Sequence, residues 1–129
     1  MNASGHVDTF ARDNLPPRDA WPEFLFDLPE LQYPARVNCG AALLDGAVAR
    51  GWGARTAIIA EDGSRLSYAA LLAYVNRIAN VLVDDMRVVP GNRVLLRGSN
   101  SPAMAAAWFA VVKAGGVAVA TMALLRARE

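Results

Sequence analysis

Residues 93–120 carry a strand–helix–strand pattern that admits few folds. The apolar run 93–97 is typical of a strand, and Ser101-Pro102 can begin a helix, since serine caps helices and proline fits the first turn. Residues 113–116 end that helix with two glycines, and 117–120 is a second apolar strand. Two strands joined by one helix over so short a segment are parallel and form a right-handed βαβ unit.

A βαβ unit of this size is not a complete sheet. Parallel sheets are normally covered by helices on both faces, and unpaired edges favour further strands. Residues 122–129, with Leu124 and Leu125 apolar, could begin another helix, but the sequence stops there. We therefore expect an incomplete α/β domain.

A short amphipathic helix precedes this unit. Asn38 is a good N-cap, the helix should reach about Arg50, and Gly51 fits a left-handed stop. The apolar face expected to be buried consists of Leu43, Leu44, Ala47 and Val48.

Two short β-branched or apolar runs then predict a β-hairpin. They are residues 56–60 and 65–67, and Asp62-Gly63 between them is a hairpin turn signal.

A second helix should follow the hairpin, capped by Ser67 and ending at roughly Asp84 or Asp85. Negative charge is unfavourable at a helix C-terminus. We interpret the two aspartates as a solvated helix end. The apolar residues at helical spacing are Leu71, Val75, Ile78 and Leu82.

The N-terminal region has a different composition. Five of the seven prolines lie between residues 14 and 37, which prevents long regular structure and suggests an arm laid over a domain. We divide the chain into an extended N-terminal arm, 1–37, and a partial α/β subdomain, 38–129. The expected anchors of the arm, by surface packing rather than ligand contact, are Trp21, Phe24, Leu25, Phe26 and Leu28.

Composition excludes several functions. With 54% hydrophobic and 19% charged residues the chain can bury a core, and a net charge of +1 without a basic stripe argues against nucleic acid. The single cysteine, Cys39, cannot form an internal disulfide, and His6 has no visible partner ligands. The first fifteen residues lack the apolar core of a secretory signal. We expect a cytoplasmic protein without a metal site.

Residues 102–125 raise a membrane-anchored alternative, because they hold one charge, Lys113, and approach the length of a span. The segment 113–116 interrupts the run with that charge and two glycines. We therefore expect no membrane span.

The residues alone identify no catalytic site. The loop 98–101 follows the first parallel strand, where open α/β sheets bind ligands, but it lacks both glycine-rich phosphate-binding patterns and is more typical of helix capping. With one histidine, one cysteine and no serine beside a plausible base, the physical interpretation stops at an incomplete α/β domain.

Two segments resemble core motifs of the adenylate-forming (AMP-dependent) superfamily. Residues 66–71, Leu-Ser-Tyr-Ala-Ala-Leu, are similar to its first strand-to-helix motif, and residues 112–119 to the Lys-Ala-Gly motif that ends a helix and enters a strand. The strand and loop 93–101 match the segment between them, so the resemblance covers about 38–125. Ala70 replaces the usual glutamate, which removes half of a capping box and weakens that helix start by roughly 0.5–1 kcal/mol.

The resemblance implies the N-terminal part of an acid–CoA ligase large domain. Such enzymes join a carboxylate to ATP with the assistance of Mg²⁺, release pyrophosphate, and transfer the acyl group to coenzyme A. Their nucleotide-binding loop, acyl pocket and catalytic lysine would lie beyond residue 129, so no catalytic, cofactor-binding or metal residue is assigned, and no cofactor is expected on these 129 residues. The motif markers, all interpreted as structural, are Leu66, Ser67, Tyr68, Leu71, Lys113, Gly115 and Gly116.

The arm resembles a narrower group. Residues 8–17, with Trp21-Pro22 and Asn38, are similar to benzoate- and 2-aminobenzoate-CoA ligases, which implies an aromatic carboxylate substrate and a role in aromatic degradation.

Alone, the chain should be inactive. The alternative is a non-enzymatic binding or dimerisation module, self-associating through its sheet edge and apolar faces. The acid, the oligomeric state and whether the gene product is longer stay open.

Overall fold

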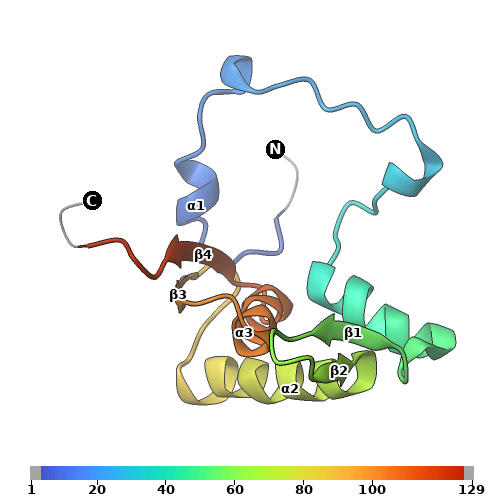
Figure 1. Ribbon diagram of the computed structural model, residues 1–129. Coiled ribbons are helices and arrows are strands. Elements are labelled where there is room, and N and C mark those ends of the chain that lie inside the picture. The colour runs from blue at the N-terminus through green and yellow to red at the C-terminus, as the bar shows by residue number, and fades with distance from the viewer. Residues whose placement is uncertain (1–3, 127–129) are drawn as a thin grey trace.

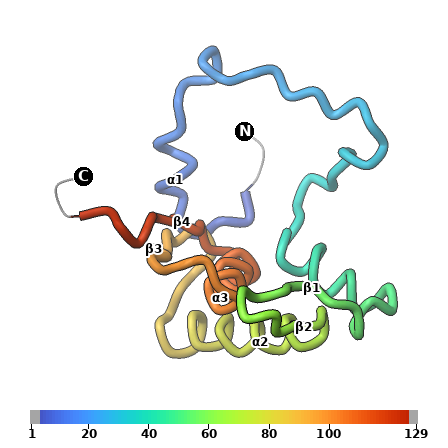
Figure 2. The backbone as a smooth tube through the Cα atoms, in the orientation of Figure 1, coloured from blue at the N-terminus to red at the C-terminus, as the bar shows by residue number. Residues whose placement is uncertain are grey.

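Helix α3 (Pro102–Lys113) lies between a two-stranded parallel sheet and helix α2 (Tyr68–Asn80), as Figures 1 and 2 show. The sheet consists of β3 (Arg93–Gly98) and β4 (Val117–Met122). The computed structural model describes residues 4–126.

The βαβ unit is confirmed. Strands β3 and β4 pair in parallel, with Arg93 opposite Val117 and Gly98 opposite Met122. The Ser101 hydroxyl accepts the N–H of Met104 at 3.2 Å and so caps α3. Among the described residues, no helix has the length and apolarity needed to cross a bilayer.

The predicted hairpin is also present, as β1 (Thr56–Ile59) paired antiparallel with β2 (Arg65–Ser67). In its turn, the Asp62 carboxylate accepts the N–H of Ser64 at 2.9 Å, and Gly63 has a φ of +81°. A positive φ favours glycine, which explains the turn signal.

Helix α2 begins where expected, with the Ser67 hydroxyl accepting the N–H of Ala70 at 3.2 Å. It continues as the π-type segment η5 (Val81–Asp85), in which the two aspartates are exposed. The chain then leaves the helix through Arg87, at a φ of +56°. The residues of α2 and η5 that are buried are Leu71, Val75, Ala79 and Leu82.

The first helical stretch, residues 39–52, contains two π-type segments, η3 (Ala41–Asp45) and η4 (Val48–Trp52). Asn38 accepts the N–H of Ala41 at 3.0 Å, and Gly51 has a φ of +82°, so the predicted cap and stop are confirmed.

One part of its predicted buried face is wrong. Leu44 and Ala47 are buried, but the side chain of Leu43 is 54% exposed. Neighbouring residues on a helix point about 100° apart, so the stripe that contains Leu44 turns Leu43 toward solvent.

The core lies where α2, α3 and the first helical stretch meet. Ala106 and Ala110 are fully buried, and their small side chains let α2 and α3 approach closely. The largest side chains enclosed there are Leu44, Leu71, Val75 and Val111.

The sheet face that points away from α3 is uncovered. Alternate residues of a strand face opposite sides, and on the outer side the side chain of Leu95 is 65% exposed, with its β4 neighbour Val119 also exposed. No third strand joins β3 and β4 within residues 4–126. This is the incomplete α/β arrangement expected from the pattern.

The helix expected over residues 122–129 does not form in its described part. Strand β4 runs to Met122, a turn follows, and residues 127–129 lie outside the described residues. The Arg97 guanidinium donates to the carbonyl oxygens of Ala123, at 3.0 Å, and of Leu125, which holds this segment in a non-helical path.

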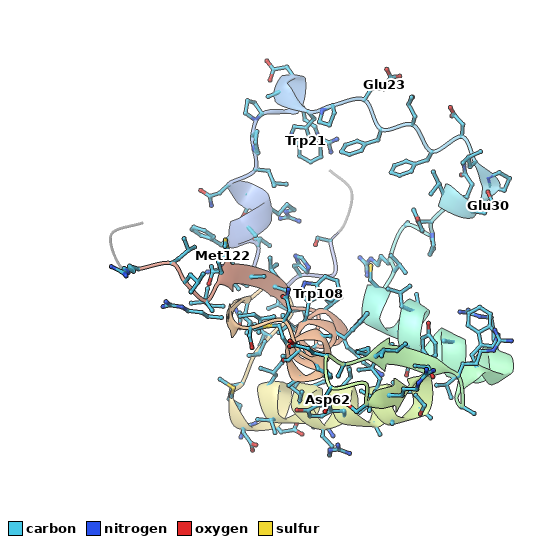
Figure 3. The ribbon with its side chains drawn as sticks, viewed as in Figure 1. Trp21, Glu23, Glu30, Asp62, Trp108 and Met122 are labelled. Carbon is cyan, nitrogen blue, oxygen red and sulfur yellow. The ribbon has the colours of Figure 1, made fainter. Side chains whose placement is uncertain are left out.

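The proline-rich segment is extended but is not laid over the rest of the chain. It contains only two single turns, η1 (Arg18–Ala20) and η2 (Pro29–Leu31), and Figures 1 and 3 show it arching away from the helices, with Trp21 and Glu30 on it. Phe24 and Phe26 stack on each other, with ring centroids 6.0 Å apart. The aromatic anchors Trp21, Phe24 and Phe26 contact one another in sequence. Trp21 is half-buried, and the other expected anchors are exposed: Phe24, Leu25, Phe26 and Leu28.

Core burial predicts different costs for two leucine truncations. Leu71→Ala removes an enclosed side chain and should lower the free energy of unfolding by about 2–5 kcal/mol. Leu43→Ala is the matched control and should change it by no more than about 0.5 kcal/mol, because that side chain is exposed. Urea denaturation measures both, and equal losses would contradict this account of the core.

Candidate functional site

The loop at the carboxyl end of β3 is built for capping. The Ser101 hydroxyl accepts the hydrogen bond that caps α3. A Cβ on Gly98 would lie 2.7 Å from the Met104 methyl, so the Gly98 backbone and the Met104 side chain are already in close contact. The loop borders an open hollow of 450 Å³ that is also lined by Glu61 and Asp62. The hydroxyl and N–H of Ser64 lower the pKa of Asp62, so this carboxylate is charged at neutral pH and disfavours a phosphate.

The first group of motif markers joins the hairpin to α2. Ser67 caps the helix, the N–H of Tyr68 donates to the carbonyl oxygen of Arg55 at 3.0 Å, and Leu71 enters the core. Leu66 is half-buried against the same core. These contacts set the angle between β2 and α2.

The second group turns α3 into β4. Gly115 has a φ of +80°, which favours glycine. Gly116 donates its N–H to the carbonyl oxygen of Val111 at 2.8 Å, and a Cβ on it would lie 3.0 Å from a Val111 methyl. The turn is therefore too tight for side chains at either position.

Lys113 is held at the end of α3 by contacts from the first helical stretch. Its ammonium group donates to both carboxylate oxygens of Asp45, at 2.8 and 2.7 Å, and only 18% of its side chain is exposed. The Asn38 amide donates to the Lys113 carbonyl oxygen at 2.8 Å. A Cβ on Gly40 would lie 3.0 Å from the Lys113 Cβ, so the two backbones are in close contact.

This four-residue contact, Asn38, Gly40, Asp45 and Lys113, is called the α3 clasp below. Sequence reasoning identified Asn38 as a cap but missed its second partner. The available signal was charge: Lys113 and Asp45 each stand alone on a mostly apolar segment, and a partly buried charge requires a partner.

An open cleft of 640 Å³ lies beside the clasp, at the amino end of β4. Residues 4–6 and 35–39 form part of its lining, together with Pro90 and residues 112–116. His6 and Cys39 both border it, but no group of three histidine, cysteine or acidic residues able to hold a metal exists within the described part of the chain.

The two marker groups do not converge on one cavity. Leu71 of the first group and Val111, next to the second, meet only in the core. Across residues 4–126 the markers thus connect secondary-structure elements. At the carboxyl end of β3, Glu61 and Asp62 line one hollow and Arg97 lines another.

A profile of AMP-binding enzymes matches residues 46–129, more than half of the chain. The chain belongs to the AMP-binding enzyme family. No curated protein sequence matches it significantly.

Solved structures of this family share the fold. Apo and ATP-bound MatB from Rhodopseudomonas palustris superpose with TM-scores of 0.61 and 0.62 at 31% identity over 69% of this chain. The inhibitor-bound N-terminal domain of FACL13 from Mycobacterium tuberculosis gives 0.60 at 30% identity, also over 69%. The matches cover 17% of MatB and 22% of the FACL13 domain.

These matches confirm two expectations from the sequence. The superfamily resemblance is correct, and the mixed α/β arrangement is that of the N-terminal part of adenylate-forming enzymes. The chain spans about a fifth of these relatives.

The α3 clasp predicts opposite effects for two glycine substitutions in the same helical stretch. Gly40→Ala should lower the free energy of unfolding by about 1–3 kcal/mol, because the new methyl group meets the Lys113 backbone. Gly46→Ala meets only the flexible end of Arg50 and should raise it by up to about 1 kcal/mol through helix propensity.

Thermal and urea denaturation of both variants measure this difference. Both glycines have right-handed helical backbone angles, so strain does not distinguish them. Stabilisation by Gly40→Ala would contradict the close contact with Lys113.

Proposed function

We propose that this chain is the N-terminal part of an ATP-dependent acid–CoA ligase. Family membership and the superposition on ATP-bound MatB support this proposal most directly. In the proposed reaction, a carboxylate attacks the α-phosphate of ATP, an acyl-adenylate forms and pyrophosphate leaves. The thiol of coenzyme A then displaces AMP.

The residues described here supply the frame for that chemistry. One hollow beside loop 98–101 is lined by Glu61 and Asp62, and Ser101 is already used as a cap, so the groups in this hollow do not favour the bare phosphates of ATP. The groups that hold nucleotide, metal and coenzyme A are proposed to belong to a longer protein. Within it, residues 38–129 are a partial subdomain and residues 1–37 its arm.

We further propose an aromatic carboxylate, benzoate or 2-aminobenzoate, as the substrate. The support is the likeness of residues 8–17 and of Trp21-Pro22 to ligases for those acids. A cytoplasmic location fits the single cysteine.

A binding or dimerisation module is the second candidate. It is favoured by the outer face of the sheet, where the paired residues Leu95 and Val119 are 65% and 39% exposed. Light scattering of the 129-residue chain tests it. A monodisperse monomer would count against self-association.

Activity of the longer protein tests the ligase proposal. We expect an open reading frame beyond Glu129 whose product catalyses carboxylate-dependent exchange of pyrophosphate into ATP. Benzoate and 2-aminobenzoate should give higher kcat/KM than aliphatic acids. The 129-residue chain is the control and should show no exchange. A preference for aliphatic acids would overturn only the substrate, whereas a stop codon at residue 130 would favour the second candidate.

The α3 clasp predicts the behaviour of Lys113 in the longer protein. Lys113→Met and Asp45→Asn each break the ion pair, so both should lower Tm and leave kcat for pyrophosphate exchange nearly unchanged. If Lys113→Met abolishes exchange while Asp45→Asn does not, Lys113 has a catalytic role and the structural assignment is wrong.

A further inference from the structure

The N-terminal residues are fixed to the turn that precedes β3. The N–H groups of Val7 and Asp8 both donate to the carbonyl oxygen of Pro90, at 2.9 Å each. Helix α1 (Phe10–Asp13) follows at once and lies near β3 and β4 in Figure 1. The N-terminal side of this contact, residues 7–13, lies outside the segment that the family profile matches, and Pro90 lies within it.

The Asp8 carboxylate is the centre of the contact. One oxygen accepts the N–H of Phe10 at 3.0 Å. The other accepts the amide of Asn92 at 2.8 Å and forms an ion pair with Arg93. These partners, the Phe10 N–H first, lower the pKa of Asp8. The carboxylate is therefore charged and fully engaged at neutral pH.

Two further contacts make the fit specific. The Arg93 guanidinium lies over the Phe10 ring, 4.6 Å from its centroid, so one arginine contacts both the charge and the ring of the segment. Gly91 has a φ of +96°, and a Cβ on it would overlap the carbonyl oxygen of Asp8. Only glycine at that position leaves room for the segment.

We propose that the turn Pro90–Arg93 is an intramolecular docking site for the acidic segment Val7–Phe10. The docked segment ties the start of the arm to the βαβ unit. Asn38, through the α3 clasp, ties its other end to Lys113. The N–H of Gly91 donates to the carbonyl oxygen of Gly115 at 2.8 Å, which places the two attachment points at the same end of the unit.

The arm is thus a loop closed at both ends, and the residues just before the docked segment border the cleft beside the α3 clasp. Residues 4–6, just before the docked segment, line one side of that cleft and residues 35–39 line another. Undocking of Val7–Phe10 would remove residues 4–6 from the cleft and leave residues 35–39 in place. This inference does not depend on the ligase activity proposed above.

Hydrogen exchange in the full 129-residue chain tests the docking. Asp8→Ala should raise the exchange rates of the Val7 and residue-8 amides several-fold, because the charged contacts with Asn92 and Arg93 are lost. Asp19→Ala, an exposed aspartate of the arm, is the control and should leave them unchanged. Unchanged rates in Asp8→Ala would overturn the proposal.

A pair of glycine variants tests the same site from its other side. Gly91→Ala and Gly63→Ala impose similar strain at a positive φ, but only the first places a methyl group against Asp8. Gly91→Ala alone should speed exchange at Val7 and Asp8, while amides in the middle of α3 stay protected. Equal effects of the two variants would show that strain, not docking, controls these amides and would refute the proposal.

Discussion

The close approach of α2 and α3 is the contact on which the other elements depend. Alanines at positions 106 and 110 allow it, and the enclosed side chains of Leu71, Val75 and Val111 fill the space around them. The hairpin packs on α2 and the parallel strands pack on α3, so both sheets take their positions from this helix pair. Neither two-stranded sheet would be stable alone in water, since a small sheet needs a helix or further strands against its apolar face.

The family motifs acquire a physical meaning from this arrangement. The first sets the exit of the chain from the hairpin into α2, through a serine cap and the contact of Tyr68 with Arg55. The second sets the exit from α3 into β4, through two glycines in a tight turn and a lysine bound to Asp45. Both are junctions, and both direct apolar helix faces toward one core. Residues with such roles are constrained by geometry even though they touch no substrate.

Local chemistry accounts for what could be predicted from the sequence. The caps at Ser67 and Ser101 and the hairpin turn at Asp62-Gly63 depend on residues within a few positions of one another, and the strand–helix–strand unit follows from the apolar pattern of residues 93–120. All were found as expected. The error after β4 has a distant cause, because Arg97 redirects the chain from 26 positions away. In the arm, the aromatic side chains contact each other locally. The pairs Lys113–Asp45 and Arg93–Asp8 join residues 68 and 85 positions apart, a separation at which a charge has many possible partners. For the site, the sequence located the marker junctions but not their contacts.

The position of the core along the chain has a consequence for biosynthesis. Within residues 4–126, every enclosed side chain lies between Leu44 and Val111, and the elements that carry these side chains all precede β4. A nascent chain that has emerged as far as Gly116 therefore already holds all the parts of this core. During N-to-C synthesis this segment can condense first, before β4 pairs with β3.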